Sequence, residues 1–87
     1  MPTTIRLQDG VRDAYGRYIT EITLRDLGLT EILVMGFVKM GQLSNTLKMV
    51  ARLSGESIGT LTWLTQDDIL LVANGLSEHI AKLHRRG

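Results

Sequence analysis

The chain has 87 residues, a formal net charge of +1, no cysteine and a hydrophobic content of 44%. These values are typical of one folded domain with a modest core, and they argue against an intrinsically disordered chain. They exclude disulfide bonds, thiolate zinc sites and cysteine nucleophiles, and the near-neutral charge argues against a dedicated nucleic-acid-binding protein.

Two segments near the N-terminus alternate between apolar and polar residues. Ile5 and Leu7 lie on one face of the first, Thr4 to Gln8. The second, Tyr18 to Arg25, is rich in β-branched residues. A period of two predicts strands, and the turn-forming residues between the segments predict a hairpin over about residues 3–25.

The segment from Val11 to Ile22 also fits a helix. Its apolar residues at helical spacing are Val11, Ala14, Tyr15, Tyr18, Ile19 and Ile22. Gly16 and the β-branched residues favour the hairpin, because both types are poor helix formers. We therefore expect a loop from Gly10 to Gly16, with the helix as the alternative.

The next predicted helix, about residues 30–41, is apolar on nearly every side. Thr30 is the expected N-cap, and Gly41 is expected to end the helix. Such a helix is either buried all round or binds another chain. Both alternatives remain: the hairpin and the last helix cover it, or part of it meets a partner. The candidate protein-binding residues are Ile32, Met35, Phe37, Val38 and Met40.

A second helix is predicted over about residues 43–54. Ser44 is the expected N-cap, and Gly55 is typical of a helix end with a left-handed glycine. The residues expected to face inward are Leu43, Leu47, Val50, Ala51 and Leu53. Ser57 is then expected to cap a short helical turn that ends at Leu61.

Trp63 lies on the corner before the last helix, between Leu61 and Leu64. A large aromatic residue beside a tight turn is usually part of the packing, so we expect Trp63 to fill a corner of the core. Trp63→Ala should then cost roughly 3–5 kcal/mol.

The last helix, about residues 66–85, is the most clearly amphipathic. Thr65 and Asp68 predict a capping box at its start. Its apolar stripe comprises Ile69, Val72, Ala73, Leu76, Ile80 and Leu83. We expect this helix to close the core.

No arrangement of side chains in the sequence indicates catalysis. His79 and His84 are five residues apart, and no third ligand has helical spacing to either one, so no metal site is predicted. The glycines follow no phosphate-binding spacing, and no nucleophile motif is present. We expect neither an enzyme nor a cofactor.

These elements predict an α+β protein, with an N-terminal β-hairpin followed by a small bundle of three helices. No linker, repeat or low-complexity run interrupts the chain, so residues 1–87 are expected to form a single domain. Residues 2–7 do not resemble a signal peptide, and no apolar run reaches the length of a membrane span. We therefore expect a cytoplasmic location.

Six short motifs follow one another along nearly the whole chain. They are Ile5-Arg6-Leu7, Glu21-Ile22-Thr23-Leu24-Arg25, Thr30-Glu31, Ala51-Arg52-Leu53-Ser54-Gly55, Ile58-Gly59-Thr60-Leu61 and Leu64-Thr65-Gln66-Asp67-Asp68. This order resembles the tail assembly chaperones of contractile-tailed bacteriophages and prophages, the Mu-like group with a translationally frameshifted gene.

The resemblance implies a non-enzymatic function. Chaperones of this family act on the tape measure protein, a long hydrophobic helical rod, and keep it soluble until tail tube subunits polymerise around it. The resemblance also implies a homo-oligomer, a frameshift-extended form of the same chain as a partner, and a location in the host cell cytoplasm. No membrane or nucleic-acid partner is expected.

Two other functions remain as alternatives. Residues 1–7 also resemble the opening strand of ribbon-helix-helix DNA-binding repressors, whose paired strands enter the major groove. That function requires a helix over Val11 to Ile22 and a turn at Gly28. An oligomerisation domain without further activity requires only spare apolar surface.

Overall fold

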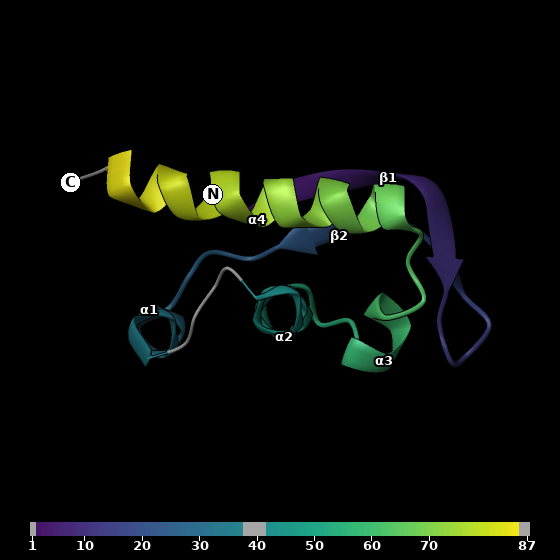
Figure 1. Cartoon of the computed structure of the whole chain (residues 1–87), viewed down its shortest axis with the longest axis horizontal. Coiled ribbons are helices and arrows are strands. Elements are labelled where there is room, and N and C mark those ends of the chain that lie inside the picture. The colour runs from purple at the N-terminus through teal and green to yellow at the C-terminus, as the bar shows by residue number, and fades with distance from the viewer. Residues whose placement is uncertain (1, 38–41, 86–87) are drawn as a thin grey trace.

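The computed structural model describes residues 2–37 and 42–85, with the side chains of residues 34–37 and 83–85 left out. In this part of the chain, strands β1 (Thr3–Arg12) and β2 (Tyr18–Leu24) precede four helices: α1 (Leu29–Phe37), α2 (Leu43–Ser54), α3 (Ile58–Leu61) and α4 (Gln66–Arg85). Figure 1 shows α4 lying along β1, with α1, α2 and α3 in a row on the other side of the molecule. The α+β class with the hairpin first is confirmed, and the predicted short turn before the last helix is counted separately as α3.

β1 and β2 form an antiparallel hairpin, as predicted. Ile5 lies opposite Ile22, and Arg12 lies opposite Tyr18. The alternative helix over Val11 to Ile22 is not formed, because this segment contains the end of β1, a turn and the start of β2. The ribbon-helix-helix alternative required that helix, and this part of the chain forms strands and a turn in its place.

The hairpin turn is shorter than the sequence suggested. β1 continues through Gly10 to Arg12, so the turn covers residues 13–17 and does not begin at Gly10. Gly10 has a φ of 82° and lies where the strand register shifts, between Arg6 and Val11. A left-handed glycine is typical of a bulge, and nothing in the local sequence distinguishes a bulge glycine from a turn glycine.

A carboxylate from the start of α4 holds this bulge. The backbone N–H groups of Gln8, Asp9 and Gly10 donate to the Asp68 carboxylate at 2.7, 3.0 and 3.0 Å. The predicted capping box is therefore half formed: the Thr65 hydroxyl accepts from the Asp68 N–H at 3.3 Å, but the carboxylate turns to β1. Because Asp68 is fully buried, these three donors replace the water that would otherwise solvate its charge.

The core lies between the hairpin and helices α2 and α4. α4 packs mainly against β1 and α2 packs against β2, so both helices lie on the apolar face of the sheet. The opposite face is polar and carries an Arg6–Glu21 ion pair at 3.3 Å. The buried apolar residues are Ile5, Leu7, Val11, Ile19, Ile22, Leu24, Leu47, Met49, Val50, Leu53, Leu61, Leu64, Val72 and Leu76.

α2 has the predicted bounds but a different start. Its N-cap position is Gln42, whose carbonyl accepts from the Thr46 N–H at 3.0 Å, and the expected cap Ser44 lies inside the helix. Leu43 is exposed rather than inward, because periodicity identifies the apolar face of a helix but not how much of its length is covered. Of the other residues expected inward, Leu47, Val50 and Leu53 are buried and Ala51 is half-buried. Gly55 ends the helix with a φ of 79°, as predicted.

The apolar stripe of α4 faces the core. Val72 and Leu76 are buried, Ile69, Ala73 and Ile80 are half-buried, and the Leu83 side chain lies outside the described residues. Within the described part of the chain, no helix combines the length and the apolar character needed to cross a membrane.

His79 is buried on the same face of α4, which the sequence did not predict. Its Nε2–H donates to the Arg25 carbonyl at 2.8 Å, and its Nδ1 accepts from the Thr3 hydroxyl at 2.7 Å. Lys82 in turn donates to the Thr3 oxygen at 3.3 Å. This chain of hydrogen bonds ties α4 to the start of β1 and to the segment after β2.

α4 approaches β1 closely at Gly75. A Cβ atom at this position would lie 2.4 Å from Ile5 Cδ1 and 2.6 Å from Ile5 Cγ1. We therefore expect Gly75→Ala to destabilise the protein in urea denaturation, because overpacking costs about 1–3 kcal/mol. That cost exceeds the gain of up to about 1 kcal/mol that alanine brings to a helix.

Gly59→Ala is the matched control, because the nearest atom to its added Cβ, Ser57 Oγ, is 4.0 Å away. The control should be at least as stable as the parent. A Gly75→Ala variant as stable as the control would show that α4 does not approach Ile5 this closely.

Candidate protein-binding surface

A buried carboxylate attaches α1 to the rest of the protein. Glu31, in the first turn, is 3% exposed and accepts a hydrogen bond from the guanidinium group of Arg25, just after β2. Arg52 of α2 lies 3.9 Å from the same Glu31 oxygen. The hydrogen bond from Arg25 is the main reason that the pKa of Glu31 lies below its ordinary value. The carboxylate is therefore charged at neutral pH.

The backbone at Gly28 sets the start of α1. The Ile32 N–H donates to the Gly28 carbonyl at 3.1 Å, so α1 begins at Leu29, and the predicted N-cap Thr30 lies inside the helix. A Cβ atom on Gly28 would lie 3.1 Å from Glu31 Oε2. Glycine at this position therefore leaves room for the buried Glu31 carboxylate. The start of α1 does not depend on a hydroxyl cap from Thr30.

The aliphatic side of α1 faces solvent. Successive helix residues are about 100° apart, so Leu29, Ile32 and Leu33 share one side of α1 and Glu31 lies on the opposite side. The three aliphatic side chains are 73%, 39% and 55% exposed. An ordinary surface helix buries its aliphatic side chains and exposes its charges, so the described side chains of α1, from Leu29 to Leu33, have the inverse arrangement. We call Leu29, Ile32 and Leu33 the α1 surface; in the described residues, no element packs closely against α1.

The structure describes only part of the predicted site. Ile32 lies on the α1 surface, whereas the side chains of Met35 and Phe37, and all of Val38 and Met40, lie outside the described residues. The prediction omitted Leu29 and Leu33, the more exposed members of the surface. A helical wheel places both leucines opposite Glu31, but the usual rule that charges face solvent would have turned them inward, so the sequence held no signal for their exposure.

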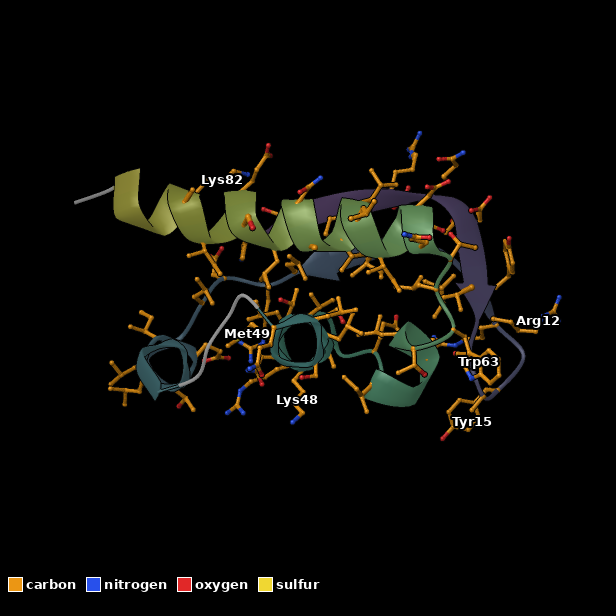
Figure 2. The ribbon with its side chains drawn as sticks, viewed as in Figure 1. Arg12, Tyr15, Lys48, Met49, Trp63 and Lys82 are labelled. Carbon is orange, nitrogen blue, oxygen red and sulfur yellow. The ribbon has the colours of Figure 1, made fainter. Side chains whose placement is uncertain are left out.

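A second exposed group lies at the far end of the molecule from α1. Figure 2 shows Arg12, Tyr15 and Trp63 together at the end formed by the hairpin turn and α3. Tyr15 is 90% exposed and Trp63 is 80% exposed. We call these three residues the aromatic end.

The prediction that Trp63 fills the core is wrong. Leu61 is fully buried and Leu64 is buried, and the Trp63 N–H donates to the Thr60 carbonyl at 3.1 Å. In this tight turn the side chains of Leu61 and Leu64 enter the core, and the side chain of Trp63 points outward. Ser57 caps α3 as predicted, because its Oγ accepts from the Thr60 N–H at 3.2 Å.

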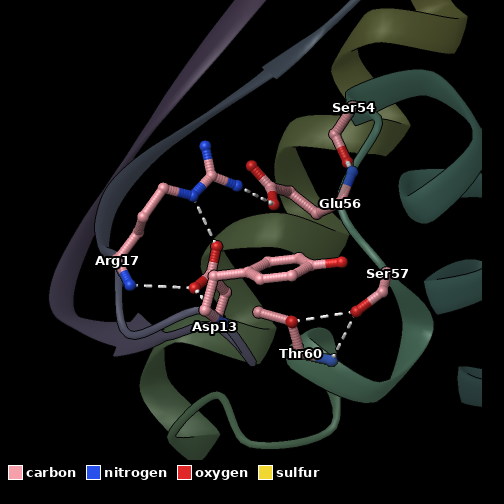
Figure 3. Close-up of polar contacts among 7 residues, drawn as sticks. Asp13, Arg17, Ser54, Glu56, Ser57 and Thr60 are labelled. Carbon is pink, nitrogen blue, oxygen red and sulfur yellow. Dashed lines mark hydrogen bonds and ion pairs between the residues drawn. The ribbon is translucent and has the colours of Figure 1, made fainter.

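The turn that carries Tyr15 is held by Asp13 (Figure 3). The Asp13 carboxylate accepts from the backbone N–H groups of Tyr15 and Arg17, both at 2.9 Å, and from Arg17 Nε at 2.6 Å. Burial raises the pKa of Asp13, but the hydrogen bonds from Arg17 and Tyr15 together lower it by more than burial raises it. The net change in this pKa is therefore downward. Arg17 also lies 3.9 Å from Glu56, which joins the hairpin turn to the segment before α3.

The buried polar side chains in the described residues have structural partners. None of their buried side-chain nitrogen or oxygen atoms lacks a hydrogen bond, and no three of their His, Asp or Glu side chains form a cluster suited to a metal ion. Two groups of exposed apolar side chains, the α1 surface and the aromatic end, lie at opposite ends of the molecule. Other large apolar side chains are exposed as well: Tyr18, Leu43, Ile58, Leu70 and Leu71. Compared with known protein families, curated proteins and solved structures, the chain matches none of them.

Proposed function

We propose that this protein is a phage tail assembly chaperone that binds the tape measure protein through α1 and keeps it soluble in the host cytoplasm. The inverted orientation of α1 carries this proposal. Exposed aliphatic surface costs about 25 cal/mol per Å² in water, so a helix that presents Leu29 and Leu33 to solvent is suited to a partner.

The spacing of the α1 surface fits a helical client. Leu29, Ile32 and Leu33 stand at positions i, i+3 and i+4, the spacing by which one helix packs against another. A tape measure protein is a long helical rod with apolar stripes, so many small copies, each with one aliphatic helix face, could cover it. The frameshift-extended form of the chain would use the same surface.

The anchor of α1 is compatible with this function. Ion pairs from Arg25 and Arg52 hold Glu31, so this attachment of α1 does not use Leu29, Ile32 or Leu33. Those side chains remain available to a client, and binding need not open the core.

A charge on the α1 surface should abolish client binding without unfolding the protein. We expect Leu33→Glu to reduce the amount of soluble tape measure protein several-fold when the two proteins are co-expressed, because burying an unpaired carboxylate is costly. Ser77→Glu places the same charge on an exposed position of α4, away from this surface, and should behave like the parent.

Circular dichroism of both variants should show the parent's fold, because both positions are exposed. If Leu33→Glu keeps the client soluble as well as Ser77→Glu does, the client binds elsewhere and the proposal fails.

A further inference from the structure

The aromatic end consists of the residue types that dominate protein interfaces. Trp, Tyr and Arg are enriched among residues that contribute most to binding, because each combines a large apolar area with a polar group. Trp63 and Tyr15 project from turns that backbone and carboxylate hydrogen bonds hold in place. The backbone at both positions is therefore fixed, so no backbone entropy need be lost when a partner covers the two rings.

The charges at this end are self-complementary. Arg12, at the end of β1, and Asp67, in the first turn of α4, are both exposed. In the part of the chain that the structure describes, neither residue takes part in an ion pair. α4 starts at the same end of the molecule as the hairpin turn and α3 (Figure 1).

We propose that two copies of this chain associate through their aromatic ends, related by a two-fold axis. A two-fold contact brings one patch against itself, so it requires aromatic surface together with charges of both signs. The rings can then pack on the partner's rings, the Arg12 guanidinium can lie over a partner's aromatic face, and Asp67 can receive the opposite charge.

The size of this end limits the strength of the dimer. The two shorter dimensions of the molecule are 22 and 21 Å between Cα atoms. A face of this size is smaller than the roughly 800 Å² per partner of a standard stable interface, even though side chains extend it. The dimer is therefore weak, with a dissociation constant in the micromolar range rather than the nanomolar range.

This arrangement places the two α1 surfaces at opposite ends of the dimer. A dimer could then hold two sites on one long client, and the second contact would be intramolecular, which raises the overall affinity. That consequence rests on the proposed function, whereas the dimer itself does not.

The single tryptophan makes the contact directly measurable. Trp63 is the only tryptophan in the chain, so the fluorescence emission of the protein reports this surface alone. We expect the emission to shift to shorter wavelength as the protein concentration is raised through the micromolar range. Sedimentation equilibrium on the same samples should show a monomer that becomes a dimer, with the same dissociation constant.

Substitutions locate the contact. Trp63→Ala is expected to raise the dissociation constant of the dimer at least about tenfold, as loss of a central interface aromatic does. Arg12→Glu should have an effect in the same direction. Leu43→Ala, which shortens an exposed apolar side chain at the start of α2, is the matched control and should leave the dimer unchanged.

Two results would overturn the proposal. The first is a monomer at all concentrations, with a water-exposed tryptophan emission that never shifts. The second is an emission that shifts only when tape measure protein is added, which would assign the aromatic end to the client. The Leu33→Glu variant separates the two proposals, because it should lose the client and still form the dimer.

Discussion

Replacing Asp68 with asparagine is expected to lower the free energy of unfolding by about 3 kcal/mol, since hydrogen bonds to charged groups contribute about 1.5–3 kcal/mol each. The buried carboxylate accepts from three backbone N–H groups of the β1 bulge. An amide in its place offers one acceptor oxygen and a donor NH₂ group, so part of the bulge loses its partner. The expected loss is a large share of a total stability of about 5–15 kcal/mol.

Asp67→Asn is the matched control for this experiment. Asp67 is exposed and sits beside Asp68 in the first turn of α4, so it shares only the favourable position at the helix N-terminus. That interaction is worth about 0.3–1 kcal/mol. Urea denaturation of both variants distinguishes the two roles: equal losses would mean that the hydrogen bonds to the bulge contribute nothing beyond the helix dipole.

The same carboxylate should make stability depend on pH. Burial raises the pKa of Asp68, but the hydrogen bonds from the three N–H groups of the bulge together lower it by more than burial raises it. The net change is therefore downward from the ordinary value of 3.8. The stabilising contribution of such a group is complete above its unfolded pKa and is lost as pH falls through its folded pKa. The pKa values of Asp13 and Glu31 are lowered as well. We therefore expect thermal melts of the parent to lose stability below about pH 4, and Asp68→Asn to show a shallower loss.

Leu61→Ala is expected to destabilise the protein by about 2–5 kcal/mol, the usual cost of a cavity left by a buried leucine. Trp63→Ala, two residues further along, should change the stability by less than about 0.5 kcal/mol, as exposed positions do. The reason is the tight turn after α3, which buries Leu61 completely and leaves Trp63 80% exposed.

The two variants must be compared at protein concentrations below the dissociation constant of the dimer, because association through Trp63 would add to the apparent stability. Thermal or urea unfolding of the two variants then gives a clear result. A Trp63→Ala loss as large as that of Leu61→Ala would place the indole ring in the core, as the sequence suggested, and would remove the basis of the aromatic end.

The regular elements of this protein follow from local patterns. The period-two alternation around Ile5 and Ile22 predicted the hairpin, and the bounds predicted for α2 and α4 agree with the structure. These features are predictable because alternation and helical periodicity depend on which residues face a core, and one face of the sheet and one stripe of each long helix do so. Gly55 was predictable for a similar reason, since a left-handed helix end favours glycine wherever it occurs.

The capping residues were less predictable. Thr30 and Ser44 have side chains that can cap a helix, yet both α1 and α2 start earlier, on backbone carbonyls of Gly28 and Gln42. Local sequence shows which side chains can accept a hydrogen bond, but the tertiary path of the chain decides where the helix starts. Asp68 shows the same limit, because its partners in β1 are 58 to 60 residues away.

The sequence by itself determined the composition of this protein's surfaces: an apolar first helix, a single tryptophan on a corner, and two long amphipathic helices around a hairpin. Only the tertiary structure decided which way these residues point. Glu31 faces the protein because Arg25, just after β2, and Arg52, in α2, neutralise its charge there. Leu29 and Leu33 lie on the opposite side of α1 and therefore face solvent. Trp63 points outward because the core already takes the leucines on either side of it. In both cases the direction of a side chain depends on contacts between segments that no local pattern contains.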